Sequence, residues 1–309
     1  MDSNGPVAAI DCGTNSTRLL VVDEHGRTLE RLMRITRLGE GVDATGLLSE
    51  VAIDRCVAVL SAFRQDMDRL GVVRARLVAT SAARDASNGS VLFAAATEAS
   101  GVSPELLTGR DEGSLSMTGA MADLDPDDGP FLVVDIGGGS TELVAGSGPG
   151  DPDLEAVSMQ IGCVRVSERF LKSDPPLPEE LAAAEAMVAG TLEVAIDAHP
   201  RFLAPHRLVG LAGTVTTLSS LQQQMVTYDR DLVHHSVLTA DQVSWWYRTL
   251  ASEDRAARLA RAGMVRGRED IIVGGAMILN IVMKRFKIDE CLVSEADILD
   301  GMVAVLLEE

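Results

Sequence analysis

The sequence contains few of the residues that build the commonest reactive sites. Its four cysteines, Cys12, Cys56, Cys163 and Cys291, lie far apart and form no C-x-x-C pair, which argues against thiol-rich zinc sites and redox motifs. None of its three lysines follows a glycine, and neither an H-E-x-x-H nor a G-x-S-x-G motif occurs. These absences argue against P-loop NTPases, zinc proteases of that type and serine hydrolases.

Long hydrophobic runs are also missing. The most apolar stretch, 271–283, is 13 residues long and contains two glycines, so it is too short to span a bilayer and is typical of a buried helix. No apolar, positively charged signal sequence follows Met1. We therefore expect a cytoplasmic protein without a membrane partner.

Basic residues are scarce, and the formal net charge is −19 with a pI near 4.6. A nucleic-acid partner is not expected, because such binding needs a basic face. Between Asp111 and Val164 there are 11 acids and no lysine or arginine. Such a run indicates either a solvated loop or, for a few of its members, a cation site.

Apolar runs and helical spacing alternate along the chain and predict the α/β class. Short strands are expected at 7–11, 19–22, 131–135 and 143–145, and a helix is expected over 52–70. Thr108 can cap a helix through Asp111 at its third position, and Ser294 can cap the final helix, with Asp297 at its third position. The segment 123–130, with two prolines and four aspartates, is the best candidate for a linker.

One segment occurs twice. VAAIDCGTNSTRLL (7–20) aligns without gaps on FLVVDIGGGSTELV (131–144), so that Asp11 matches Asp135, and Arg18 matches Glu142. A matching pattern at the start of each half indicates a duplicated domain. Tight glycine turns expose backbone N–H groups that can bind anions, and an aspartate at a strand end can bind Mg²⁺.

The repeated turns resemble the phosphate loops of the acetate kinase, actin and Hsp70 superfamily. More narrowly, the chain resembles the exopolyphosphatase and guanosine pentaphosphatase (Ppx/GppA) family, most of all its short actinobacterial members. The matching segments run in order along almost the whole chain: 8–21, 37–42, 79–88, 108–113, 133–143, 161–168, 211–218, 267–272 and 294–301.

The resemblance implies two ribonuclease H-like (actin-like ATPase) domains with a cleft between them. We expect an N-terminal domain over 1–124, which the C-terminal helix 296–309 could complete, and a second domain over 125–295. Homodimerisation is expected by analogy with the family.

The resemblance also implies roles for individual residues. Glu112, in the segment TGRDEG, matches the catalytic base that activates water, whereas Asp111 is interpreted as a helix cap. Arg84 is expected to contact phosphate. Asp135 and Glu142, with Asp11 from the first domain, are expected to hold Mg²⁺. Asp135 and Glu142 are also expected to order the attacking water. The expected substrate-binding residues are Asn15, Ser16, Thr17, Arg18, Gly138, Gly139, Ser140, Thr141, Gly213, Thr214 and Arg268.

Three functions remain open at this level. The first is a Mg²⁺-dependent exopolyphosphatase acting on inorganic polyphosphate, with short chains as possible preferred substrates because the C-terminal helical domains of longer family members are missing. The second is hydrolysis of guanosine pentaphosphate, since the motifs are shared. The third is an actin-like ATP-binding kinase or switch, which Glu112 and the SEADILDG segment (294–301) disfavour.

Overall fold

The computed structural model describes residues 5–148, 151–204 and 207–308. The chain forms two compact units, Met1–Gly119 together with Ile298–Glu309, and Ala120–Asp297. Within the described residues, no helix combines the length and the apolar character needed to cross a membrane.

The first unit contains a five-stranded mixed sheet of order β3-β2-β1-β4-β5. The first three strands form an antiparallel meander, and β4 and β5 run parallel to β1. The strands are β1 (Val7–Cys12), β2 (Ser16–Val22), β3 (Thr28–Ile35), β4 (Arg74–Ala79) and β5 (Pro104–Leu106). The helices are α1 (Val42–Thr45), α2 (Glu50–Leu70), α3 (Ser81–Asp85), α4 (Gly89–Ser100), α5 (Gly109–Met121) and α13 (Ile298–Glu308).

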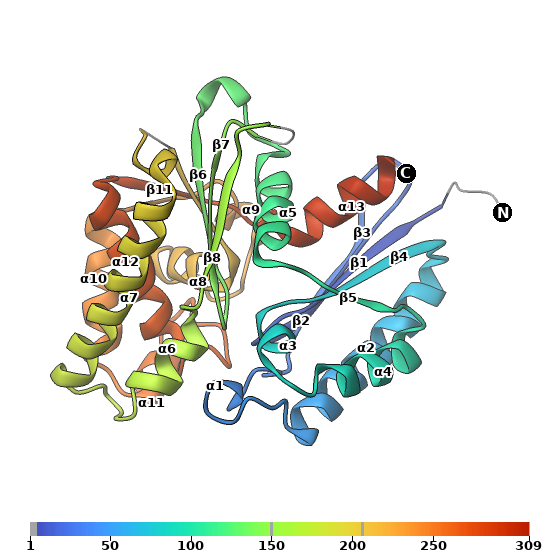
Figure 1. Ribbon diagram of the computed structural model, residues 1–309, viewed down its shortest axis with the longest axis horizontal. Helices are drawn as coiled ribbons and strands as arrows, with labels where there is room; N and C mark the ends of the chain where they lie inside the picture. Colours follow the sequence, from blue (N-terminus) through green and yellow to red (C-terminus); the bar gives the residue numbers. More distant parts are fainter. Residues whose placement is uncertain (1–4, 149–150, 205–206, 309) are drawn as a thin grey trace. The chain divides into compact units, whose positions relative to one another are not determined.

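Both faces of this sheet are buried, and alternation along β1 explains how. Ala8 and Ile10 point into a core that they share with α2 and α4, whereas Val7 and Ala9 point to the opposite face, which α13 covers (Figure 1). Successive strand residues face opposite sides of a sheet, so a continuous apolar run is the sequence signature of a strand covered on both faces.

The second unit contains a six-stranded mixed sheet of order β10-β11-β9-β6-β7-β8. Helices α7, α10 and α12 gather on one side of it (Figure 1) and share one apolar core with it. The strands are β6 (Phe131–Ile136), β7 (Thr141–Gly146), β8 (Glu155–Met159), β9 (Arg207–Leu211), β10 (Val237–Thr239) and β11 (Glu290–Val293). The helices are η1 (Pro126–Asp128), α6 (Cys163–Phe170), α7 (Pro178–Ala198), η2 (Pro200–Leu203), α8 (Ala212–Gln222), α9 (Arg230–Val233), α10 (Ala240–Ala251), α11 (Arg255–Leu259) and α12 (Ile272–Phe286).

The predicted α/β class is confirmed, and so is the repeat at the level of strand register. In β1–β2, Asp11 lies opposite Arg18, and in β6–β7, Asp135 lies opposite Glu142. The linker segment contains the short helix η1. The interpretation of Ser294 as a helix cap is wrong: α13 begins only at Ile298, and Ser294 instead closes a local turn with Ala296.

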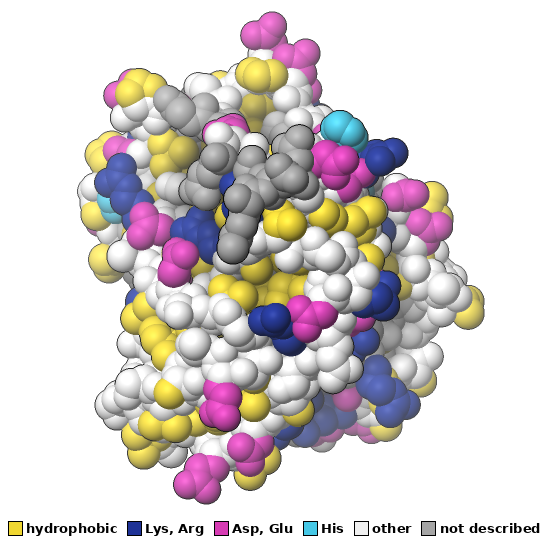
Figure 2. Space-filling model, turned by 90° about the vertical axis from the view of Figure 1, so that its right-hand side faces the viewer, with side chains coloured by type: hydrophobic (Ala, Val, Ile, Leu, Met, Phe, Trp, Pro, Cys, Tyr) yellow, Lys and Arg dark blue, Asp and Glu magenta, His cyan; other side chains and the backbone are white. Residues whose placement is uncertain are grey.

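The surface charge is mixed locally despite the large net charge. On the face drawn in Figure 2, acidic and basic side chains are interspersed with hydrophobic ones. Many arginines form ion pairs with acids that are distant in sequence, as Arg285 does with Glu193. The net charge of the chain therefore does not describe the field at any one site.

Candidate active site

The turn between β6 and β7 is held by its carbonyl groups. The Gly137 oxygen accepts a hydrogen bond from the Cys163 amide at 2.9 Å, and the Gly138 oxygen accepts from the Val164 amide at 2.9 Å. The Gly139 oxygen accepts from Nε of Arg165 at 2.7 Å. The turn thereby caps the first amides of α6, which satisfies donors that a helix start leaves unpaired.

This arrangement determines where the amides of the turn point. The C=O and N–H groups of a planar trans peptide point in opposite directions. Because the carbonyls of three consecutive glycines face α6, the N–H groups of Gly138, Gly139 and Ser140 face away from it. Three successive N–H groups on one side of a turn make an anion-binding nest.

The turn between β1 and β2 is built on the same principle. The Thr14 oxygen accepts from the Gly39 amide at 2.8 Å, and the Asn15 oxygen accepts from the Thr36 amide at 3.1 Å. The following N–H groups, those of Asn15 and Ser16, therefore point away from the 36–39 segment. Each unit thus presents backbone donors at the end of its first hairpin.

The two hairpins differ in their paired charges. Asp11 and Arg18 form an ion pair, with Nη2 of Arg18 2.7 Å from Oδ2 of Asp11. At the equivalent register, Asp135 is only 8% exposed and Glu142 only 1% exposed. Two carboxylates directly opposite each other in a sheet repel, and their burial increases the cost unless a cation or proton is shared.

The two hairpins also differ on the neighbouring third strand, β8 in the second unit and β3 in the first, which supplies the residue opposite Glu142 or Arg18. We call the three residues that lie opposite one another on neighbouring strands a row. In the second unit Ser158 on β8 lies opposite Glu142, and its hydroxyl donates to Oε1 of Glu142 at 2.6 Å. In the first unit the residue opposite Arg18 is Met33. In the second unit all three residues of the row, Asp135, Glu142 and Ser158, are thus polar.

The threonine hydroxyls of the repeat turn inward. Thr17 and Thr141 are fully buried; Oγ1 of Thr17 lies 2.9 Å from Oγ1 of Thr36, and Thr141 donates to the Ile161 oxygen at 2.5 Å. Both threonines hold their turns together from inside in this structure, and their part in ligand binding stays a prediction.

Arg84 and Glu112 meet within the first unit. Arg84, at the end of α3, donates from Nη1 to Oε2 of Glu112 at 3.2 Å and to the Leu107 oxygen at 2.9 Å. Glu112 lies in the first turn of α5, and Thr108 caps this helix through the Asp111 amide at 3.2 Å, as predicted. Nη2 of Arg84 is buried and has no protein partner among the described residues, so it keeps a donor for an anion.

Three further predicted residues meet at the start of α8. Asp135 lies beside Leu211 in the parallel β6–β9 pair, which brings the start of α8 next to the end of β6. A Cβ on Gly213 would lie 1.2 Å from Nη1 of Arg268, so only glycine leaves room for that guanidinium. Thr214 is buried at this helix start, where the positive end of the helix dipole favours anions.

Sequence reasoning did not single out Gly162, Ser158 or Tyr228. A Cβ on Gly162 would lie 2.3 Å from the Gly138 oxygen, and the IGCVRVSE segment that contains it is the signal that could have found it. Tyr228 donates to Glu295, and burial together with this carboxylate raises the pKa of its phenol. Ser158 carries no motif, because its role depends only on the strand register.

The residues that could hold a cation are the carboxylate pair of the second hairpin. Hard cations such as Mg²⁺ take carboxylate oxygens and usually one or two protein carboxylates, with water and phosphate filling the other positions. Among the described residues, no group of three or more His, Cys, Asp or Glu side chains forms a complete cage. The pair of Asp135 and Glu142 therefore fits a cation shared with a phosphate ligand.

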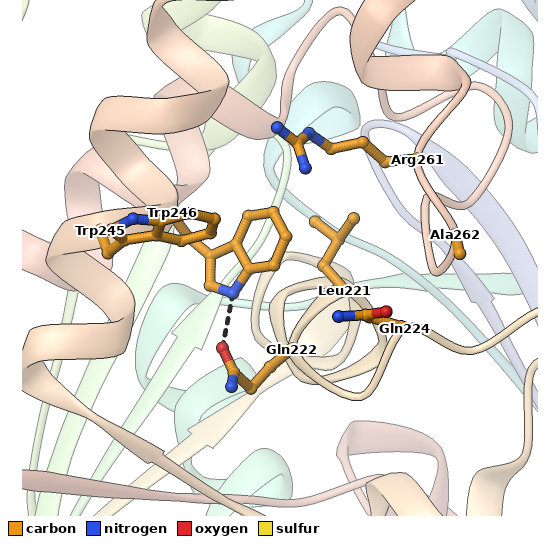
Figure 3. A pocket seen from close by; sticks show the side chains of 7 residues that line it. All are labelled: Leu221, Gln222, Gln224, Trp245, Trp246, Arg261 and Ala262. Atoms are coloured by element: carbon orange, nitrogen blue, oxygen red, sulfur yellow. Dashed lines mark hydrogen bonds between the residues drawn. The ribbon is translucent and has the colours of Figure 1, made fainter.

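A separate pocket of about 500 Å³ lies at the other end of α8. Both tryptophans of the chain line it, with an edge-on contact between the rings of Trp245 and Trp246 (Figure 3). Gln222 accepts from the indole of Trp246 at 2.9 Å, and the guanidinium of Arg261 lies over that ring. None of the predicted site residues lines this pocket.

Comparisons with known proteins agree with the repeated phosphate turns. The model of the Ppx/GppA phosphatase family matches residues 19–309, so the chain belongs to this family. It is 41% identical to Exopolyphosphatase 2 of Mycobacterium tuberculosis, over 97% of this chain and 98% of that protein.

The chain is also similar to a solved structure of the same family and to a second curated protein. The crystal structure of the Aquifex aeolicus Ppx/GppA family member superimposes with a TM-score of 0.81 at 32% identity, covering 99% of both chains. A guanosine-5'-triphosphate,3'-diphosphate pyrophosphatase of Photobacterium profundum is 28% identical, over 98% of this chain and 59% of that protein.

Proposed function

We propose that this chain is a phosphoanhydride hydrolase that releases the terminal phosphate of inorganic polyphosphate. The observation that carries the proposal is the second hairpin, where three backbone amides face away from α6 and two buried carboxylates lie opposite each other. Phosphate oxygens match the amides, and a cation that the carboxylates bind would match the phosphate charge. The relative named exopolyphosphatase matches 97% of this chain.

The proposal assigns water activation to Glu112. A carboxylate that faces a phosphate can orient and deprotonate the attacking water. Its contact with Arg84 fixes the orientation of the carboxylate, because the guanidinium donates to one of its oxygens. Arg84 would donate to a phosphate oxygen from Nη2.

Mg²⁺ is the proposed cofactor, held by Asp135 and Glu142, and it would neutralise the charge that develops on the phosphoryl oxygens. The proposed role of Asp11 is different in kind, because Arg18 already binds its carboxylate in this structure. Asp11 and Arg18 would together orient the first turn, and the first-turn amides would bind further phosphate oxygens. Arg268, Gly213 and Thr214 would bind phosphate at the start of α8.

The decisive experiment measures orthophosphate release from polyphosphates of several lengths, guanosine pentaphosphate and ATP, each with Mg²⁺. We expect turnover of polyphosphate, and a loss of at least about 1000-fold in Glu112→Ala, a change of about 4 kcal/mol in barrier. Glu98→Ala, which removes an exposed acid from α4, is the matched control. Full turnover by Glu112→Ala would contradict the role of this residue.

Guanosine pentaphosphate is the second candidate substrate, because a relative is named for the corresponding activity. Competition between the two substrates at equal concentration decides between them. We also propose a cytoplasmic homodimer, on the family resemblance, and light scattering coupled to gel filtration measures the mass in solution.

A further inference from the structure

We propose that Ser158 is a positioning residue that holds Glu142 for cation binding, an inference that rests on the proposed function. Ser158 is half-buried on β8, directly opposite Glu142 in the antiparallel β7–β8 pair. Its hydroxyl donates to Oε1 of Glu142 at 2.6 Å, a short distance typical of a hydrogen bond to a carboxylate.

The sheet register explains why this hydroxyl matters. Glu142 lies between Asp135 on β6 and Ser158 on β8, so its carboxylate has a like charge on one side and a donor on the other. A donor favours the ionised form and fixes which way the carboxylate points. Without it, repulsion from Asp135 is free to turn the carboxylate away from a shared cation.

The first unit provides the contrast within the same chain. There the middle residue of the row is Arg18, which neutralises Asp11 directly, and the third residue is Met33, whose side chain carries no hydroxyl. Where the facing side chains already carry opposite charges, no hydrogen-bond donor is needed on the third strand to hold the carboxylate. The serine therefore accompanies the hairpin in which two like charges lie opposite each other.

The test measures cation binding without substrate. Mn²⁺, which replaces Mg²⁺ as an oxygen-liganded ion, is titrated into the whole protein and followed by electron paramagnetic resonance. We expect Ser158→Ala to weaken Mn²⁺ binding about tenfold, whereas Ser158→Thr, which keeps the hydroxyl, stays within about twofold of the original chain. Ser252→Ala, which removes an exposed hydroxyl at the end of α10, is the control.

The melting temperature of each variant in chelator separates folding from positioning. If Ser158→Ala is folded and binds Mn²⁺ as tightly as the original chain, or if Ser158→Thr is as weak as Ser158→Ala, the proposal is overturned. It is also overturned if the original chain binds no Mn²⁺. Failure of the proposed function has a different signature: Mn²⁺ binding that depends on Ser158, with no phosphate release from polyphosphate.

Discussion

The first hairpins of the two units share a backbone design but have opposite electrostatics. Both turns direct their carbonyls toward a supporting segment and their amides away from it, and both place an acid at the end of the first strand. In the first unit that acid is paired with Arg18, whereas in the second it lies opposite Glu142. In the function that we propose, the duplicated scaffold keeps amides for anion binding in both copies, while the second copy gains a cation site.

The difference teaches which part of a repeat is structural. The backbone hydrogen bonds are the same in kind because both turns must satisfy buried polar groups. The residue at position 18 or 142 is not constrained by the backbone, since either side chain fits the strand register. Its charge decides whether the aspartate of the first strand lies opposite an unlike or a like charge.

Exchanging that charge has the largest expected effect. Glu142→Arg gives the second hairpin the charges of the first, so the new guanidinium should pair with Asp135 and remove the proposed cation site. We expect phosphate release to fall by at least about 1000-fold, and we expect Mg²⁺ to raise the melting temperature of the original chain but not of this variant. Glu142→Gln, of nearly the same shape, controls for packing. Mg²⁺-dependent turnover by Glu142→Arg would refute the assigned role of the carboxylate pair.

The next largest effect is expected at the glycines that support the two turns, where the same substitution should cost different amounts of stability. A Cβ on Gly162 meets the backbone of Gly138 at 2.3 Å, whereas a Cβ on Gly39 meets the methyl group of Thr14 at 2.3 Å. Backbone cannot move aside as a side chain can, so we expect Gly162→Ala to cost about 3 kcal/mol and Gly39→Ala about 1 kcal/mol. Urea unfolding of both variants measures the costs, and equal costs would show that both turns yield equally.

Removal of the counter-charge from the first hairpin should lower the free energy of unfolding without preventing folding. The side chain of Asp11 is 5% exposed and that of Arg18 is 21% exposed. We expect Arg18→Gln to lower the free energy of unfolding by about 2 kcal/mol, somewhat less than for a fully buried pair. Arg27→Gln, which removes the exposed partner of Asp23 in the loop between β2 and β3, should cost less than about 1 kcal/mol. The same cost for both variants would mean that the Asp11 pair has no special importance.

The smallest effects are expected at the equivalent threonines. Thr17→Val and Thr141→Val keep the β-branched shape but remove a buried hydroxyl that bonds to Thr36 in one unit and to the Ile161 carbonyl in the other. Each should lower the free energy of unfolding by about 1 kcal/mol. Phosphate release that falls much more than stability in either variant would show that the hydroxyl also contacts the ligand.

Local sequence predicted much of the scaffold. The helix over 52–70 is α2, which Ser49 caps through the Ala52 amide, and the predicted Thr108 cap is present. These features depend on residues within one or two turns of each other, so local pattern suffices. The start of α13 was predicted wrongly because Ser294 has a capping spacing but bonds within a turn before the helix.

Contacts between distant segments could not be predicted in this way. Cys12 and Cys56 looked isolated, yet their sulfurs lie 3.8 Å apart behind the first turn. The pairing of Ser158 with Glu142 depends on the register between β7 and β8. The sequence does not specify this register, because the two strands are not joined by a tight turn. Such pairings follow from which strands become neighbours, and sequence spacing does not specify that.

The sequence by itself determined the class, the repeat and the family, because apolar alternation and glycine turns are written in consecutive residues. It also identified the acidic residues next to the two turns, which are Asp11, Asp135 and Glu142. Only the tertiary structure decided which side chains lie opposite each other, with Arg18 paired to Asp11 and Glu142 opposite Asp135. Charge balance depends on cross-strand neighbours and burial, and for this reason the ion pair of Arg18 and the carboxylate pair of the second hairpin became visible only in the folded chain.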